Sequence, residues 1–447
     1  MTGIKAGGVG SGLDINGLVA QLVAADRAPQ AQRLNRVEAK ANFQLSALAR
    51  LTSAFDALKR ATDPLKADTS YQARRVTSSA EDAFTATAGA NTPNGSFQIE
   101  VLALAAASKQ VSAGLAEDAA LGGGTLQVQL GEASFEVAID PDATPEQARD
   151  AFNAAAQAAG AGVAATMVRG DNGEVSLAFT AQQTGLANAL SITSADPGLA
   201  ALTSGQMTAL STAADAQVRI DGVLRSSATN VIEGAVDGLS ITAKAITDTP
   251  QSLTVARDNA PARQAAQGLV NAFNGAMSAL REATRFNAAT GEAGALNGDA
   301  LARGAGAALR NSFIAFVGEA SDLGISGRVD GNLSFDAAKF DAALAADPDR
   351  VESLLKGFGA AMAETTGRYV GDAGAFTDRR KGLDSQVRRV ADQREALDRR
   401  MEQVEGRYLR QFTALDSLIG QLNNTSAFLS QQLDGLAGLN RQIANRR

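Results

Sequence analysis

The sequence of 447 residues contains no cysteine and no histidine. The absence of cysteine excludes disulfide bonds, thiolate metal sites and cysteine nucleophiles. The absence of histidine excludes Ser-His-Asp catalysis and imidazole ligation of metals. An enzyme built from this chain would have to use carboxylates, lysine, serine, threonine or tyrosine. These absences therefore favour a structural or interaction role over catalysis.

Aromatic residues are also scarce, at 4% of the chain, and tryptophan is missing altogether. The core must therefore consist mainly of alanine, leucine, valine and isoleucine, which suits thin helical bundles and small sheets. A hydrophobic content of 45% is nevertheless sufficient for a folded core. The net charge of −7 argues against nucleic acid as a partner. Apolar runs stay well short of the roughly 18 residues of a membrane span, and the first residues lack the apolar core of a signal peptide.

The longest pattern in the sequence is a helical one, which extends from Leu383 to about Ile443. Its apolar residues recur at steps of three, four or seven, far beyond the length of an ordinary globular helix. An apolar stripe of this length must be buried against another element, because a single helix cannot cover its own stripe.

A second helical stripe lies at the other end of the chain. Residues 1–12 are rich in glycine and are interpreted as a flexible terminus, since the strand and the Lys-Ser or Lys-Thr pair of a phosphate-binding loop are missing. Asp14 is the predicted helix N-cap. Pro29 is expected to end the first helix because it removes an amide donor, and a second helix is expected to end at Asp63-Pro64. The two terminal stripes predict that the chain ends pack against each other, with the middle inserted between them.

From about Ala73 the apolar period changes to two, which predicts β-strands as far as Arg257. Thr144 is expected to cap a helix within this region, with Pro145 at its first position. We expect a β-rich head module of residues 73–110 and 214–257, with an α+β head module of residues 111–213 inserted in it.

The helical pattern returns at Pro261 and is interrupted by a hairpin between Leu323–Ile325 and Leu333–Phe335, with Asp330-Gly331 in its turn. Asp336 and Asp347-Pro348 are predicted helix starts, and Gly371–Lys381 is predicted to be a linker. The remaining expected parts are a helical-bundle or coiled-coil domain and a terminal leg that is disordered in the monomer. The bundle comprises residues 41–72 and 258–409, and the leg comprises residues 1–40 and 410–447.

The predicted fold class is therefore α+β and multidomain, with the N- and C-terminal helices paired into a coiled-coil or helical-bundle leg and with inserted β-rich head modules. No catalytic, cofactor or metal site stands out. Side chains with oxygen atoms that could bind a metal occur at every second position from 330 to 336, at Asp330, Asn332, Ser334 and Asp336. A hairpin followed by a helix cap explains all of these residues without a metal. We predict no enzymatic activity, no cofactor and no metal.

Motifs at both ends and in the middle of the chain identify a family. The first is Gly10-Ser11-Gly12-Leu13-Asp14-Ile15-Asn16-Gly17-Leu18-Val19, followed by Gln21-Leu22-Val23. The second includes Arg407-Tyr408, Gln411-Phe412, Asn424-Thr425-Ser426, Phe428-Leu429 and Gln431-Gln432-Leu433. Together with Ile220-Asp221-Gly222 and Gly331-Asn332-Leu333 in the middle, they resemble the hook-associated protein 2 family, the FliD family of flagellar filament cap proteins. The resemblance spans the whole chain in the expected order.

The resemblance implies a ring of subunits at the tip of the bacterial flagellum, outside the cell, where it promotes folding and insertion of flagellin and prevents flagellin loss. It implies export through the flagellar channel without a cleaved signal peptide. The implied partners are further copies of the chain, flagellin, hook-filament junction proteins, an export chaperone, the type III export apparatus and, for the exposed head, host mucin. The predicted self-assembly residues are apolar positions of the two terminal segments, namely Leu13, Ile15, Leu18, Val19, Leu22, Val23, Tyr408, Phe412, Leu415, Ile419, Leu422, Phe428, Leu429, Leu433 and Leu436.

Other classes of protein stay open at this point. A hook-associated or flagellin-type filament subunit shares the terminal coiled-coil arms, although it lacks a head region of this kind. A surface adhesin would present the head to a host ligand, which the head sequence does not reveal, and a carbohydrate-acting enzyme is a more distant alternative. The number of subunits in a ring, from four to six, is also left open.

Overall fold

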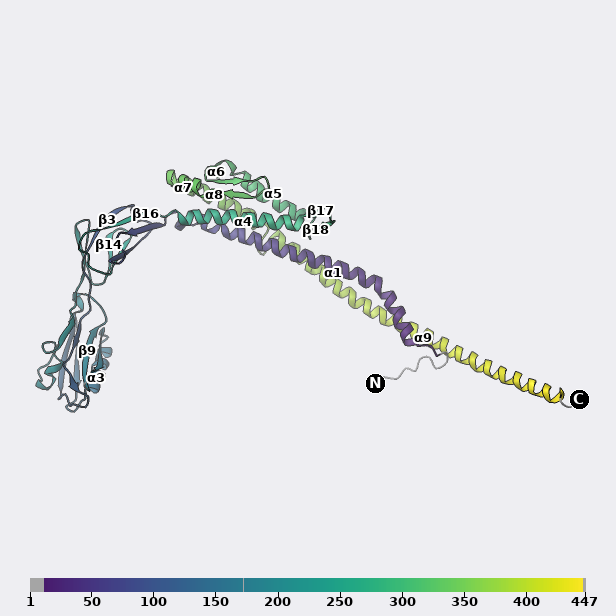
Figure 1. Cartoon of the computed structure of the whole chain (residues 1–447), viewed down its shortest axis with the longest axis horizontal. Coiled ribbons are helices and arrows are strands. Elements are labelled where there is room, and N and C mark those ends of the chain that lie inside the picture. The colour runs from purple at the N-terminus through teal and green to yellow at the C-terminus, as the bar shows by residue number, and fades with distance from the viewer. Residues whose placement is uncertain (1–11, 172, 445–447) are drawn as a thin grey trace. The chain divides into compact units, whose positions relative to one another are not determined.

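The computed structural model describes residues 12–171 and 173–444, with side chains described as far as Asp434. The chain divides into two compact units, one made of Met1–Lys66 and Arg263–Arg447 and the other of Ala67–Ala262. We call them the helical unit and the β-rich unit. Long helices near both chain ends and strands in between confirm the predicted α+β multidomain class (Figure 1).

The helical unit contains a bundle of helices and two short hairpins. Phe55 of its first helix lies against Phe376 and Tyr369, with ring centroids 5.0 and 5.6 Å apart, and these rings are part of the bundle core. Its elements are α1 (Ile15–Ala61), α2 (Asp63–Lys66), α4 (Ala260–Thr284), β17 (Phe286–Asn287), β18 (Glu292–Ala293), α5 (Ala300–Ile314), α6 (Val317–Asp322), β19 (Ile325–Gly327), β20 (Leu333–Phe335), α7 (Ala337–Ala346), α8 (Pro348–Gly367) and α9 (Ala375–Ala444).

Helix α1 begins as predicted but does not end at Pro29. The carboxylate of Asp14 accepts a hydrogen bond of 2.9 Å from the backbone N–H of Gly17, which caps the helix. The prediction that Pro29 ends the helix is wrong, because α1 continues to Ala61. Residues 24–30 are exposed, so water can satisfy the carbonyl that loses its amide partner at the proline. Figure 1 shows α1 bending toward its N-terminal end, and a proline is a common cause of such a bend.

Two further boundaries differ from the sequence predictions. Gly371–Lys381 is not wholly a linker, because α9 begins at Ala375 and spans 70 residues, roughly 105 Å of helix. The first strand of the predicted hairpin is Ile325–Gly327 rather than Leu323–Ile325, since α6 extends to Asp322 and Gly324, at φ +73°, turns the chain after it. The predicted caps Asp336 and Asp347 are confirmed, as both side chains accept backbone N–H groups of the following helix.

The described residues of the β-rich unit form four antiparallel sheets, in the strand orders β1-β16-β3-β12-β13, β14-β15-β2, β10-β6-β7 and β11-β4-β9-β5, with β8 paired to β9. Its elements are η1 (Asp68–Ser70), β1 (Arg74–Ser78), β2 (Phe84–Ala88), β3 (Gly95–Ala103), β4 (Lys109–Val111), β5 (Leu115–Ala116), β6 (Gly124–Leu130), β7 (Ala133–Ile139), α3 (Pro145–Ala158), β8 (Val163–Arg169), β9 (Glu174–Ala181), η2 (Leu186–Asn188), β10 (Leu190–Thr193), η3 (Pro197–Leu202), β11 (Thr208–Ser211), β12 (Ala216–Ile220), β13 (Val223–Ser227), β14 (Val231–Val236), β15 (Leu239–Ala243) and β16 (Gln251–Arg257).

Two separate hydrophobic cores lie within the β-rich unit. One includes Phe84, Ile99, Val218, Ile241 and Leu253, from the two sheets that contain β3 and β15. A tight turn at Asp221-Gly222, where both residues have positive φ, joins β12 and β13 of this core.

The second core is built around α3. Thr144 and Gln147 form a reciprocal capping box at the start of this helix, which confirms the predicted cap. Phe152 of α3 lies between Phe135 of β7 and Phe179 of β9, with ring centroids 5.8 and 4.8 Å away. The helix thus joins two small sheets through one aromatic contact on each side.

Candidate assembly surface on the terminal helices

Helices α1 and α9 of the helical unit pack side by side over much of their length (Figure 1). Their contact contains a hydrophobic cluster of Leu34, Val390, Leu397 and Met401, all of which are buried. Val23, Ala31, Val37 and Val404 pack around this cluster and are partly buried. The two terminal stripes therefore do bury each other, over the part of the chain that this cluster covers.

Polar contacts across the two helices define an antiparallel register. Asp26 accepts a hydrogen bond from the Tyr408 hydroxyl at 3.0 Å, and Arg27 forms an ion pair with Asp398 at 2.6 Å. Further along α1, Arg394 contacts Glu38 at 2.5 Å. Half-exposed pairs of this kind contribute only about 0–1 kcal/mol each to folding. These pairs therefore favour one register of the two helices over others, and they add little to the free energy of folding.

These interhelical pairs were not predicted from the sequence. Charges beside the apolar stripe were visible there, but pairing one charge with another 371 residues away requires the register of the two helices. Only the favourable spacing within one helix could be read locally, as for Glu395 and Arg399, which do form an ion pair at 3.7 Å.

The predicted assembly residues on α1 divide between two faces. Ile15 and Val19 are buried, with 3% and 1% of their surfaces exposed, and Val23 is half-buried. The remaining three residues face solvent and are Leu13, Leu18 and Leu22, at 50%, 38% and 38% exposure. The start of α1 therefore carries one face packed within the unit and a second apolar face that is exposed.

The predicted residues on α9 show a gradient of burial. Tyr408, Phe412 and Ile419 are half-buried. The side chain of Leu436 lies outside the described residues. The other predicted residues are exposed, namely Leu415 (48%), Leu422 (61%), Phe428 (58%), Leu429 (55%) and Leu433 (66%). Leu418, which the sequence prediction missed, is also exposed (52%). We call residues 415–434 the distal segment of α9.

The register explains this gradient. Because Asp26 lies opposite Tyr408 in an antiparallel pair, the first turns of α1 lie opposite the α9 residues that immediately follow Tyr408. Helix α9 then extends past the start of α1 at Ile15, and every described residue from 421 to 434 is exposed. The distal segment contains no Lys or Arg, and Asp416 and Asp434 are its two acidic residues. It presents a long apolar stripe with little charge to solvent.

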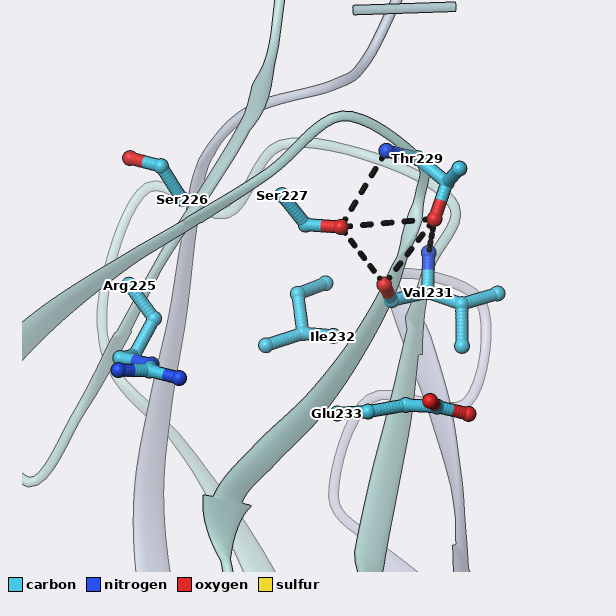
Figure 2. A pocket seen from close by; sticks show the side chains of 7 residues that line it. All are labelled: Arg225, Ser226, Ser227, Thr229, Val231, Ile232 and Glu233. Atoms are coloured by element: carbon cyan, nitrogen blue, oxygen red, sulfur yellow. Dashed lines mark hydrogen bonds between the residues drawn. The ribbon is translucent and has the colours of Figure 1, made fainter.

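The β-rich unit contains a groove that offers an alternative candidate site (Figure 2). It lies between β13 and β14, has a volume of about 490 Å³, and is lined by Arg225, Ser226, Ser227, Thr229, Val231, Ile232 and Glu233. The hydroxyls of Ser227 and Thr229 each bond within the turn, at 2.9 and 3.1 Å to the carbonyl of Val231. The lining contains no aromatic ring, so the groove lacks a stacking surface for a sugar.

The described residues contain no cluster of three or more acidic side chains positioned for a metal ion. None of the helices in the described part of the chain combines the length and apolar content needed to cross a membrane.

The fold and this surface define an α+β protein whose helical unit is made from both chain ends and leaves an apolar helical stripe exposed. Residues 11–108 match the family described as flagellar hook-associated protein 2 N-terminus, and residues 213–424 match the corresponding C-terminus family. The chain belongs to the flagellar hook-associated protein 2 family, which confirms the resemblance expected from the terminal motifs.

Individual relatives match over nearly the whole chain. The A-type flagellar hook-associated protein 2 of Pseudomonas aeruginosa is 31% identical over 97% of this chain and 98% of its own length. Flagellar hook-associated protein 2 of Escherichia coli K12 is 29% identical over 97% of this chain and 99% of its own length. The crystal structure of the D1-D2-D3 domains of the flagellar cap protein FliD from Escherichia coli covers 76% of this chain and 99% of its own, with a TM-score of 0.60 and 24% identity. This last similarity shows a shared fold.

Proposed function

We propose that this protein is a flagellar filament cap, a ring-forming assembly chaperone at the distal tip of the bacterial flagellum, outside the cell. In this role it promotes the folding and insertion of exported flagellin and prevents its loss. Membership of the hook-associated protein 2 family supports the proposal. The observation that carries it is the distal segment of α9, a helix whose apolar stripe is exposed in the single chain.

The exposed stripe supplies a driving force for assembly. Burial of a leucine side chain contributes about 1.5–3 kcal/mol, and the stripe presents several leucines along one helix. A lone helix gains most of its stability from packing of its apolar face, so the distal segment becomes stable when a neighbour covers it. The neighbours proposed here are further copies of the chain, which would also cover the exposed side chains of Leu13, Leu18 and Leu22 at the start of the helical unit.

The other partners follow from the cap role. They are flagellin, the hook-filament junction proteins, a cytoplasmic export chaperone and the flagellar type III export apparatus, through whose channel the chain would leave the cell. A helix end that orders only on assembly suits passage through a narrow channel, because it adds little to the stability of the free chain. Host mucin, the partner that the family resemblance implies for the exposed head, belongs to the same proposal, with the β-rich unit as the surface that would contact it.

Electron microscopy of flagella tests the cap function. A gold label on an epitope inserted in the exposed β13–β14 loop is expected at filament tips only. A label distributed along the shaft would identify a filament subunit instead. Deletion of the gene is expected to release flagellin into the medium and leave hooks intact. A glycan-binding and hydrolysis screen of the purified protein would separately expose an adhesin or a carbohydrate-acting enzyme.

A further inference from the structure

The helical unit contains an open groove that is separate from the terminal helix pair. It has a volume of about 290 Å³ and lies between α4, the end of α5 and the β19–β20 hairpin. Phe273, Phe313 and Leu333 line its floor and are buried, with the two phenylalanine ring centroids 6.4 Å apart. Ile314, the last residue of α5, lines the groove and is 61% exposed. The groove is therefore apolar in its floor and in part of its rim.

The walls of the groove are held in place by specific bonds. Asn274 of α4 exchanges two hydrogen bonds with the backbone of Leu333, at 2.7 and 2.9 Å. Arg281, two helical turns further along α4, donates to the carbonyl of Asp330 at 2.8 Å and to the Asn332 side chain at 3.0 Å. Gly327 has no side chain, and a Cβ at this position would lie 3.2 Å from the Phe313 ring. A larger residue would therefore crowd the groove. The hairpin is thus fixed to α4 and forms a preformed wall.

The rim of the groove carries an excess of positive charge. Arg310 and Arg328 both line it, and both are exposed. Among the described residues Arg310 has no ion pair, and the nearest acidic group of the hairpin is Asp330. A hydrogen bond from the Asn332 backbone lowers the pKa of Asp330, and the charges of Arg328 and Arg281 lower it further. The groove is thus lined by two arginines, Arg310 and Arg328, and by no acidic residue, which leaves its rim cationic.

We propose that this groove is a docking site for a segment of another protein that presents a bulky apolar side chain next to a carboxylate. The apolar floor would take the side chain, and Arg310 with Arg328 would bind the carboxylate. An exposed apolar cavity would by itself accept many partners, and the two arginines of the rim are what select an acidic one. Val329, at the fully exposed tip of the hairpin, extends the apolar contact beyond the groove. The inference does not depend on the cap function, because it concerns different residues and a different contact.

The test uses the full chain and fluorescence anisotropy. The probe is a fluorescein-labelled helical peptide with leucines three and four residues apart beside two glutamates. We expect it to bind at low salt, and to bind about tenfold more weakly when its glutamates are replaced by glutamine. Replacement of its leucines by alanine is expected to remove binding. Equal binding of the glutamate and glutamine peptides would overturn the proposal.

Variants of the protein test the same contact from the other side. Arg310→Glu is expected to lose the glutamate peptide and to bind a matched lysine peptide instead, and Ile314→Ser is expected to weaken both. Arg303→Glu, on the same helix but outside the groove, is the matched control and should bind as the unmodified protein does. All three positions lie at the surface or beside it, so unchanged melting curves establish that the variants fold.

Two results with these variants would overturn the proposal. Loss of peptide binding in Arg303→Glu to the same extent would show a general charge effect and overturn the proposal. If the peptides do not bind but the Arg310→Glu variant changes an oligomer of the unmodified protein into monomers, a second copy of the chain occupies the groove and the assignment to another protein is wrong.

Discussion

At the residue scale, leucines on the two terminal helices have opposite environments. Leu34 of α1 is 1% exposed within the cluster that joins α1 to α9, whereas Leu429 on the distal segment is 55% exposed. Both belong to the same kind of helical stripe in the sequence. The difference comes from the register of the helix pair, which places a partner beside one leucine and none of the described chain beside the other.

This difference gives a prediction for a matched pair of substitutions. Leu34→Ala is expected to destabilise the helical unit by about 2–5 kcal/mol, because it removes buried methyl groups and leaves a cavity. Leu429→Ala is expected to leave the melting temperature of the dilute protein unchanged. Thermal unfolding of both variants, followed by circular dichroism, is the measurement. Similar losses in the two variants would show that the distal segment is already packed in the single chain.

At the scale of an element, α9 combines a packed part and an exposed part in one continuous helix. The packed part contains Val390, Leu397 and Met401, and the exposed part is the distal segment. The sequence prediction that residues 1–40 and 410–447 are disordered in the monomer stays a prediction.

Hydrogen exchange measures that stability directly. In dilute protein, amides of residues 410–447 are expected to exchange quickly, and those of residues near Val390 slowly, because only the latter lie beside buried side chains. Residues 1–40 are expected to exchange faster than the rest of α1. Strong protection of residues 410–447 at low concentration would contradict the idea that these residues become ordered on assembly.

Charge placed on the distal segment tests its role in assembly. The double variant Leu429→Asp and Leu433→Asp introduces two carboxylates into the stripe, and each would cost several kcal/mol if buried without a partner. The expected result is flagellin secreted into the medium, short or absent filaments and normal hooks. The substitutions lie on exposed positions, so the melting temperature of the dilute protein should stay the same. Normal filaments in the double variant would show that this stripe is not an assembly contact.

At the scale of the whole molecule, the β-rich unit has the features of an independent folding unit. Its two ends meet in one sheet, where Arg74 of β1 lies opposite Arg257 of β16, and the N–H of Asp258 donates to the carbonyl of Ala73 at 2.8 Å. It also contains two cores of its own. Acidic residues outnumber basic ones in this unit, whereas the helical unit has a basic excess, so the two units also differ in charge.

The excised fragment 73–257 is therefore expected to fold alone. Circular dichroism should show a β-rich spectrum and a cooperative thermal transition, because the terminal strands β1 and β16 pair with each other and close the sheet. The same fragment with Leu253→Asp, a fully buried residue of β16, is the control that should not fold. A fragment that stays unfolded under native conditions would show that the division of the chain at residues 73 and 257 is wrong.

The sequence by itself determined the local structure and the family. The helix caps at Asp14, Thr144 and Asp336 and the change of apolar period near Ala73 depend on residues close together in the sequence, so they could be predicted without knowledge of the tertiary structure. The terminal motifs are also runs of neighbouring residues, so the family could be recognised from the sequence. Boundaries decided by packing were less predictable, as the continuation of α1 through Pro29 shows.

The tertiary structure alone decided which parts of each stripe are buried and which are exposed. Both parts of α9 have the same apolar periodicity, and only the antiparallel register with α1 leaves Leu422, Leu429 and Leu433 uncovered. The groove beside Arg310 was equally invisible, because its floor and rim come from α4, α5 and a hairpin that are far apart in sequence. Local patterns specify elements through contacts between near neighbours, whereas exposure depends on distant segments that only the folded chain brings together.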